Sequence, residues 1–214
     1  MQRHDDGDLS IISAGPVGFG NNIYIVVDRA TGESAFVDAP GTAEELIAIA
    51  EEAGVQPKAI LLTHSHFDHT PGIDGLKEKY GCHVYAGAEE TNLAEGHRDT
   101  AVAHGETVKV GSLAFRAIHN PGHTPGSTTF VTGAHAFVGD TLFPGGPGRS
   151  GSNALLKQEL ESITSRLYTL PGNTTVWPGH GATTTIDLSK AEYEVFAAKE
   201  HDPDLHGDVS WLDS

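Results

Sequence analysis

The sequence predicts an α/β fold in which helices cover β-sheets. Short apolar runs bounded by Gly, Pro or Asp occur along the whole chain, and segments with helical periodicity stand between them in both halves. Strands and helices mixed in this way are typical of sheets packed against helices. No low-complexity tract or linker divides the 214 residues, so we expect a single domain over residues 1–214.

Nine apolar runs are short enough to be strands, and turn-forming residues bound them. They span residues 9–13, 23–27, 35–37, 59–62, 83–85, 113–118, 128–131, 136–138 and 175–177. Helices are expected at 42–53, 153–170 and 188–200. The first of these can begin with a capping box, because Glu45 follows Thr42 by three positions.

The charge restricts the partners of the chain. The formal net charge is −16, from 29 acidic and 13 basic residues, and a chain of this charge without a basic patch repels a phosphate backbone. We therefore expect a small-molecule substrate and no nucleic acid. The sequence contains no signal peptide and no apolar run of membrane-spanning length, which predicts a cytoplasmic protein without a membrane partner. It makes no prediction about oligomeric state.

A cluster of metal-ligating residues follows directly after the run at 59–62. The segment Thr63-His64-Ser65-His66-Phe67-Asp68-His69 holds three imidazoles and a carboxylate within six positions. In an extended segment His64 and His66 point the same way, and a turn after Phe67 can bring Asp68 and His69 to a neighbouring position. Four ligands divided in this way suit a pair of adjacent metals.

Three further candidate ligands follow other strands. His123 lies in Asn-Pro-Gly-His-Thr-Pro-Gly, Asp140 follows the run at 136–138, and His180 follows Trp-Pro-Gly. Open α/β sheets commonly bind ligands at the ends of their strands. A glycine before each of these residues leaves room for close approach of the backbone.

Four motifs together resemble those of the metallo-β-lactamase-fold hydrolases, and among these a short form of the glyoxalase II-like group, the hydroxyacylglutathione hydrolases. The motifs are THSHFDH at 63–69, PGHTPGS at 121–127, GDTLF at 139–143 and PGHG at 178–181. The resemblance implies a four-layer αββα sandwich with metals at one edge of its two sheets. It also implies the ligands: His64, His66 and His123 for one ion, Asp68, His69 and His180 for the second, and Asp140 as the bridge.

The implied activity is hydrolysis of an ester-like bond, with a thioester as the first candidate, by attack of a hydroxide held between the metals. We expect two divalent ions, zinc first and iron or manganese as alternatives, with Asp68 and Asp140 as catalytic residues. Asp140 stands where β-lactam-cleaving relatives often have cysteine, which argues against a β-lactamase.

Arg149 is the expected substrate-binding residue. The segment 145–149 matches the family loop whose basic residue contacts a carboxylate of the thiol carrier, although Pro147 stands where relatives frequently have cysteine. A solvated loop arginine is the alternative. Residues 181–214 alone follow His180, so we expect no separate C-terminal helical domain of the kind that helps long relatives hold glutathione.

Three other functions stay open. Persulfide dioxygenases share the fold and would bind one ferrous iron through His64, His123 and Asp140, but Gly151 stands where that group often has aspartate. A lactonase of the same fold would use the same centre. A non-catalytic metal-binding module would need its open coordination positions blocked, and nothing in the sequence indicates that.

Features outside the motifs have simpler interpretations. Asp38 is read as a turn-forming aspartate, with support of a metal ligand as the alternative. Cys82 is read as a small buried hydrophobe. The acidic tail, residues 200–214, is expected to be a solvated end, with Trp211 and Leu212 as the residues able to anchor it.

Overall fold

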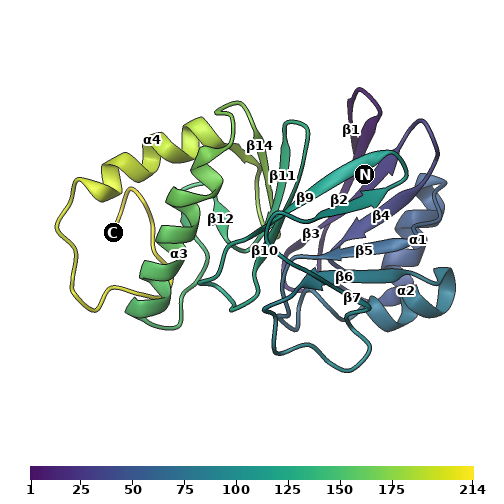
Figure 1. Ribbon diagram of the computed structural model, residues 1–214, viewed down its shortest axis with the longest axis horizontal. Helices are drawn as coiled ribbons and strands as arrows, with labels where there is room; N and C mark the ends of the chain where they lie inside the picture. Colours follow the sequence, from purple (N-terminus) through teal and green to yellow (C-terminus); the bar gives the residue numbers. More distant parts are fainter.

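The computed structural model describes residues 1–214 and arranges them in four layers, helix, sheet, sheet and helix (Figure 1). Two helices, α1 (Ala43–Ala53) and α2 (Ile73–Tyr80), cover the outer face of a seven-stranded sheet. Two others, α3 (Asn153–Ser165) and α4 (Ile186–Ala197), cover the outer face of a six-stranded sheet. The αββα sandwich expected from the motifs is confirmed.

The first sheet follows the order of the chain. Its strands are β1 (Gln2–Asp6), β2 (Leu9–Val17), β3 (Asn21–Asp28), β4 (Ser34–Val37), β5 (Ala59–Leu62), β6 (His83–Gly87) and β7 (Thr100–Val102). Strands β1 to β4 pair antiparallel, and β4 to β7 pair parallel. The crossovers between the parallel strands contain α1 and α2, which places both helices on one face of the sheet.

The second sheet is built from the other half of the chain. In spatial order its strands are β15 (Thr184–Thr185), β14 (Thr175–Pro178), β11 (His135–Gly139), β10 (Thr128–Thr132), β9 (Leu113–His119) and β8 (Thr107–Val110). Its one parallel pair, β11 with β14, is connected through α3. A small two-stranded ribbon, β12 (Leu142–Phe143) with β13 (Gly146–Pro147), leads into the loop that contains Arg149.

Alternating side chains fill three apolar cores between the four layers. In β5, Leu61 points between the two sheets while Ile60 points toward α1 and α2. In β11, Phe137 enters the same central core from the opposite sheet, and Val138 packs beneath α3 and α4. Both sheets are therefore buried on two faces, which explains why their strands read as continuous apolar runs.

The helix boundaries differ from the predicted ones in part. Thr42 forms the predicted capping box with Glu45 at the start of α1. The helix expected at 153–170 ends at Ser165, and Leu167–Thr169 forms a separate 3-10 turn because Arg166 leaves the helical conformation, with φ −123°. No helix of the chain is both long enough and apolar enough to cross a membrane.

Several elements were missed by the sequence prediction: α2, β1, β7, β8, β12, β13 and β15. Helix α2 has only eight residues and buries only Ile73 and Leu76, too few to show a helical period. Strand β1 is exposed over its whole length, so it shows no alternation of apolar and polar residues.

The C-terminal tail is anchored at one of the two expected residues. Trp211 is fully buried in the core beneath α3 and α4, so the expectation of a solvated end is wrong there, whereas Leu212 stays exposed. The Trp211 amide donates to Gly145 O at 2.7 Å, and the Gly207 amide donates to Ser150 O at 3.0 Å. The tail thus holds both ends of the loop that contains Arg149.

Candidate metal centre

The seven residues expected to bind metal come from four loops, each of which follows a strand, and they lie together at one edge of the sandwich. His64, His66, Asp68 and His69 follow β5, His123 lies between β9 and β10, Asp140 follows β11, and His180 follows β14. Their side-chain contacts divide them into two groups of three, with Asp140 between the groups.

His64, His66 and His123 form the first group. One ligand nitrogen from each lies within 4.8 Å of the others, and His66 Nδ1 is 2.9 Å from His123 Nε2. The Nε2 atom of His64 is buried and has no hydrogen-bond partner. A buried polar atom without a partner costs free energy unless something binds it. This donor set fits a cation that prefers imidazole nitrogen.

Asp68, His69 and His180 form the second group, again with ligand atoms within 4.8 Å of one another. Asp68 Oδ2 lies 3.2 Å from His180 Nε2 and 3.5 Å from His69 Nε2. His69 is fully buried, whereas 27% of the His180 side chain is exposed. His66 of the first group is also exposed, so a cation could reach either group from solvent.

Asp140 reaches both groups with one carboxylate. Its Oδ2 atom is 3.9 Å from His123 Nε2 in the first group and 3.4 Å from His180 Nε2 in the second. Its Oδ1 atom is 3.4 Å from His69 Nε2 and has no hydrogen-bond partner, although it is buried. Ten buried side-chain polar atoms of the chain have no hydrogen-bond partner; two of them, Asp140 Oδ1 and His64 Nε2, belong to the expected ligand set, which supports the fit to bound metal.

Glycines before the ligands allow this close approach, as the sequence predicts. A Cβ atom on Gly179 would lie 2.3 Å from Asp140 Oδ1 and 2.6 Å from His69 Cε1. Gly139 adopts φ +54°, and a Cβ atom there would lie 2.3 Å from Thr63 Oγ1. Any side chain at either position would push the ligand loops apart.

Asp38 supports the centre, which the interpretation as a plain turn residue missed. Its carboxylate accepts hydrogen bonds from Thr63 N at 2.6 Å and Thr63 Oγ1 at 2.8 Å, and it lies 2.8 Å from His69 Nδ1. Asp38 also lies within ligand distance of His64 and His69, but both of its oxygens are already engaged. We therefore read Asp38 as a residue that orients ligands.

This network sets which ring nitrogens face the centre. Because Thr63 Oγ1 donates to Asp38, it can accept from His64 Nδ1 at 3.0 Å, which leaves His64 Nε2 unprotonated. By the same reasoning His69 Nδ1 donates to Asp38, and His123 Nδ1 donates to Arg149 O at 3.0 Å. Outer nitrogens tied to oxygen acceptors are the usual way to present the inner nitrogen to a metal.

Charge at the centre favours cations. Burial acts to raise the pKa of Asp140, but contacts with His180 and His69 outweigh it and hold that pKa well below its ordinary value. Burial acts to lower the pKa of His69, yet Asp38 and Asp140 raise it to about 10. Burial also lowers the pKa of His123 to about 4, so this ring is neutral. The carboxylates that attract a proton to His69 would attract a metal ion equally, with release of that proton.

Two more supporting residues were missed by sequence reasoning. The Asn21 side chain donates to Asp68 Oδ2 at 2.9 Å and lies 3.2 Å from His180 Nε2. The buried Glu90 carboxylate accepts from Ser65 Oγ at 3.0 Å and from Thr124 Oγ1 at 2.6 Å, so it joins the loops of the first and second motifs. Neither residue lies in a motif, and no periodicity marks it.

Arg149 lies beside the first group through its backbone, whereas its side chain is largely exposed. The guanidinium Nε is 3.5 Å from Asp208 Oδ2 of the tail, and 73% of the side chain is exposed. An exposed ion pair of this kind is weak, of the order of ~0–1 kcal/mol. The arginine can therefore exchange this partner for another carboxylate.

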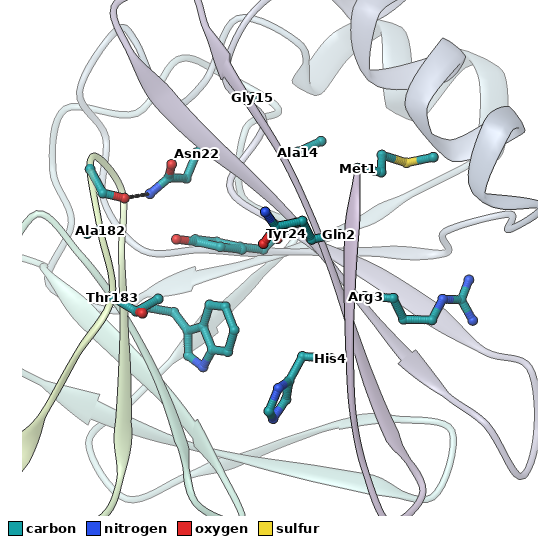
Figure 2. Close-up of a pocket in the computed structure, with 13 residues that line it drawn as sticks. Met1, Gln2, Arg3, His4, Ala14, Gly15, Asn22, Tyr24, Ala182 and Thr183 are labelled. Atoms are coloured by element: carbon teal, nitrogen blue, oxygen red, sulfur yellow. Dashed lines mark hydrogen bonds between the residues drawn. The ribbon is translucent and has the colours of Figure 1, made fainter.

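A separate cleft of about 560 Å³ lies where β1 and β2 of the first sheet diverge from the segment 181–183 of the second (Figure 2). Tyr24 and Trp177 line it, and Asn22 donates to Gly181 O across it at 2.9 Å. None of the seven candidate ligands lines this cleft. This cleft is therefore distinct from the candidate metal centre.

Comparison with known proteins relates this geometry to a family. Residues 16–198 match the Metallo-beta-lactamase superfamily. The hydroxyacylglutathione hydrolase of Xanthomonas oryzae pv. oryzae (strain MAFF 311018) is 39% identical over 163 residues, which are 76% of this chain and 62% of that protein. The enzyme of the same name from Bradyrhizobium sp. (strain ORS 278) is 37% identical over 177 residues, 81% of this chain and 66% of that protein. The chain thus spans about two thirds of the length of these curated relatives.

Solved structures agree with the fold. ETHE1 from Myxococcus xanthus superposes with a TM-score of 0.74 at 29% identity, over 84% of this chain and 81% of that one. The BLEG-1 B3 metallo-beta-lactamase gives the same TM-score and identity over 85% of this chain and 96% of that one. Because the superfamily match covers the chain from the last two residues of β2 to the end of α4 and includes every candidate ligand, the chain belongs to the metallo-β-lactamase superfamily.

Proposed function

We propose that the chain is a hydrolase of ester-like bonds, with thioesters as its main substrates, that works with two divalent metal ions. The observation that supports this most is the approach of two ligand groups to the single carboxylate of Asp140. His64, His66 and His123 would hold one ion, Asp68, His69 and His180 the other, with Asp140 between them. Bound there, the ions would supply a nucleophile from water at neutral pH and polarise the substrate carbonyl.

The protein would contribute orientation and charge. Asp38 and the Arg149 carbonyl hold the outer nitrogens of His69 and His123, so that the inner nitrogens point to the centre. The Asn21 amide donates to Asp68 Oδ2 and so fixes one oxygen of that carboxylate. Ligands held in advance in this way lose little entropy when they bind metal, and they place the substrate carbonyl reproducibly.

Known relatives support the choice of substrate and the number of metals. The two relatives at 39% and 37% identity are named hydroxyacylglutathione hydrolases, which points to thioesters of glutathione. TTHA1623, 30% identical with a TM-score of 0.67 over 84% of this chain and 96% of that one, is described in a di-iron-bound form, which supports two ions. Imidazole and carboxylate donors suit zinc and also iron or manganese, and we propose zinc.

We further propose that Arg149 binds a carboxylate of the thiol carrier. Its exposed guanidinium lies on the loop whose carbonyl accepts from His123, so it stands beside the first ligand group. A guanidinium can hold a carboxylate through two parallel hydrogen bonds. The weak contact with Asp208 is the only ion pair it would give up.

The direct test is hydrolysis of lactoyl-glutathione by the zinc-loaded protein, followed by release of free thiol. We expect kcat/KM of at least about 10⁴ M⁻¹s⁻¹. Asp140→Ala should lower it by several orders of magnitude and reduce metal content, because two cations would then face each other without the charge between them. Asp74→Ala, at an aspartate with 84% of its side chain exposed, is the matched control. Oxygen consumption with a persulfide, and no thiol release from thioesters, would instead establish the dioxygenase alternative.

A further inference from the structure

Two phenylalanines are the most exposed large apolar side chains of the chain. Phe19 is 72% exposed and Phe67 is 67% exposed, yet their rings contact each other edge to face with centroids 5.0 Å apart. Phe19 precedes α1 in the sequence and Phe67 follows it. Two aromatic rings that meet in solvent form an apolar surface without a partner inside the fold, and such surfaces commonly bind something.

Both phenylalanines lie close in the chain to residues of the candidate metal centre. Phe67 lies between the ligands His66 and Asp68 in the chain. Phe19 is at the tip of the β2–β3 hairpin, and Asn21, the first residue of β3, donates to Asp68 Oδ2 at 2.9 Å. Gly20, directly after Phe19, lies beside the His180 ring, since a Cβ atom there would be at van der Waals distance, 4.0 Å, from its Nδ1.

The hairpin tip has a defined position. Gly18 and Gly20 adopt φ +51° and +90°, which glycine tolerates at no steric cost. The Gly20 amide donates to Val17 O at 2.9 Å, and the Asn22 amide donates to Gly179 O at 2.7 Å, beside His180. The Phe19 ring is therefore presented by a backbone that is tied to the ligand loops.

The phenylalanine pair and Arg149 lie beside different ligands of the centre. Phe67 links His66 of the first group to Asp68 of the second in the chain, Phe19 is followed by Gly20, which lies beside the His180 ring, and a third ring, Phe143, has its centroid 6.4 Å from that of His180. Arg149 adjoins His123 of the first group. A thioester placed across the centre, with its carrier carboxylate at Arg149, would extend its acyl group toward the phenylalanines.

We propose that Phe19 and Phe67 form an acyl-binding wall that selects thioesters with an aromatic or branched apolar acyl group. The inference rests on the proposed thioester hydrolysis and specifies the acyl half of the substrate. Two rings set edge to face offer an apolar surface and a ring face against which an aromatic acyl group packs while water leaves both surfaces. A small hydroxyacyl group would cover little of this surface.

The first test measures binding without turnover, with the S-benzyl and S-methyl thioethers of glutathione as probes of the zinc-loaded protein. We expect the wild type to bind the benzyl thioether about tenfold more tightly than the methyl thioether. Phe19→Ala should abolish most of this preference, and Phe19→Trp should restore it. Leu188→Ala, at an exposed leucine on α4, is the matched control and should keep the preference. Absence of a benzyl preference in the wild type, or its survival in Phe19→Ala, would overturn the proposal.

The second test separates this proposal from the proposed function. We compare kcat/KM for the phenylacetyl and lactoyl thioesters of glutathione in the wild type, Phe19→Ala and Phe67→Ala, with metal content measured for each because Phe67 adjoins two ligands. We expect both substitutions to lower the phenylacetyl-to-lactoyl ratio by about tenfold with metal content unchanged. Hydrolysis of both thioesters with an unchanged ratio would disprove the wall and leave the function standing. No hydrolysis of either thioester would disprove the proposed function. The binding preference for the benzyl thioether would then still show whether Phe19 and Phe67 form the acyl-binding wall.

Discussion

Asp38 combines two properties that explain why aspartate stands at this position. Its backbone lies in the left-handed region, with φ 59°, which aspartate and asparagine tolerate better than other residues with a side chain. Its carboxylate accepts from Thr63 and from His69 Nδ1 at the same time. These donors face both side-chain oxygens of Asp38, so both oxygens must accept. A carboxylate does this, whereas an amide of the same shape has only one accepting oxygen.

Asp38→Asn tests this role because it preserves the backbone conformation and removes one acceptor. If the amide oxygen faces Thr63 N, the amide NH₂ faces His69 Nδ1. His69 Nδ1 must then accept a hydrogen bond, which moves the ring proton to Nε2. Nε2 is the nitrogen that should bind metal. We expect zinc affinity to fall about 10- to 100-fold. Competition with a chelating dye measures this, with Asp74→Asn as the control. Unchanged affinity would show that Asp38 is only a turn residue.

Arg149→Ala tests recognition of the carrier. Loss of a charged contact worth about 1.5–3 kcal/mol should raise KM for glutathione thioesters roughly ten- to a hundredfold, with a modest change in kcat. Arg149→Lys should restore part of the loss, since it keeps the charge but not the paired hydrogen bonds. A small neutral ester without a carboxylate should be turned over equally by all three proteins. If KM for the thioesters did not change, carriers without a carboxylate would become the better candidates.

At the scale of elements, a buried carboxylate at the other end of β3 ties the two sheets together. Asp28 Oδ2 accepts from Ser112 N at 2.6 Å and Ser112 Oγ at 2.8 Å, in the turn between β8 and β9 of the second sheet. Gly111 adopts φ +60° there, and a Cβ atom on it would lie 2.3 Å from the Asp28 carboxylate. The contact joins the edges of the sandwich away from the metal centre.

Asp28→Asn should lower stability without altering the centre. The Ser112 backbone N–H, aided by the Ser112 and Thr31 hydroxyls, outweighs burial and holds the pKa of Asp28 well below its ordinary value. A lowered folded-state pKa gives stability that is present above the unfolded value of about 3.9 and is lost as pH falls below it. We expect Tm at pH 7 to fall by about 5 °C, and the difference from wild type to shrink toward pH 2. Thermal unfolding at several pH values measures this, and a difference independent of pH would contradict it.

At the scale of the whole molecule, the centre joins both sheets. Asp68 and His69 follow a strand of the first sheet, while Asp140 and His180 follow strands of the second. These ligands come together only when the two sheets are packed, so metal should bind the folded protein and not the unfolded chain. Metal binding should therefore stabilise the fold. Stability and metal content are thus coupled.

Metal removal tests this coupling together with the stoichiometry. Two zinc ions per chain are expected at saturation, because seven candidate ligands exceed what one tetrahedral ion can bind. Chelation should lower Tm by about 5–10 °C, as expected for a loss of about 2–3 kcal/mol in a chain of this length, and added zinc should restore it. Metal analysis that returned one ion at saturation would contradict the two-metal proposal.

The sequence alone predicted the fold class, the nine main strands and the assembly of seven candidate metal ligands, and the structure shows that these residues meet. It could do so because apolar runs reflect burial on both faces of a strand, and because the ligands lie in short contiguous motifs such as His64 to His69. The single domain and the separate metal roles of each ligand stay predictions.

Only the tertiary structure decided which residues support and surround the centre. Asp38, Asn21 and Glu90 contact residues that lie 25 to 159 positions away in the chain, and the Phe19–Phe67 pair forms only when a hairpin and a ligand loop meet. Trp211 anchors the tail for the same reason, through a core that residues far from it in sequence complete. Such contacts follow from packing of distant segments, which leaves no period or motif in the sequence around any one of them.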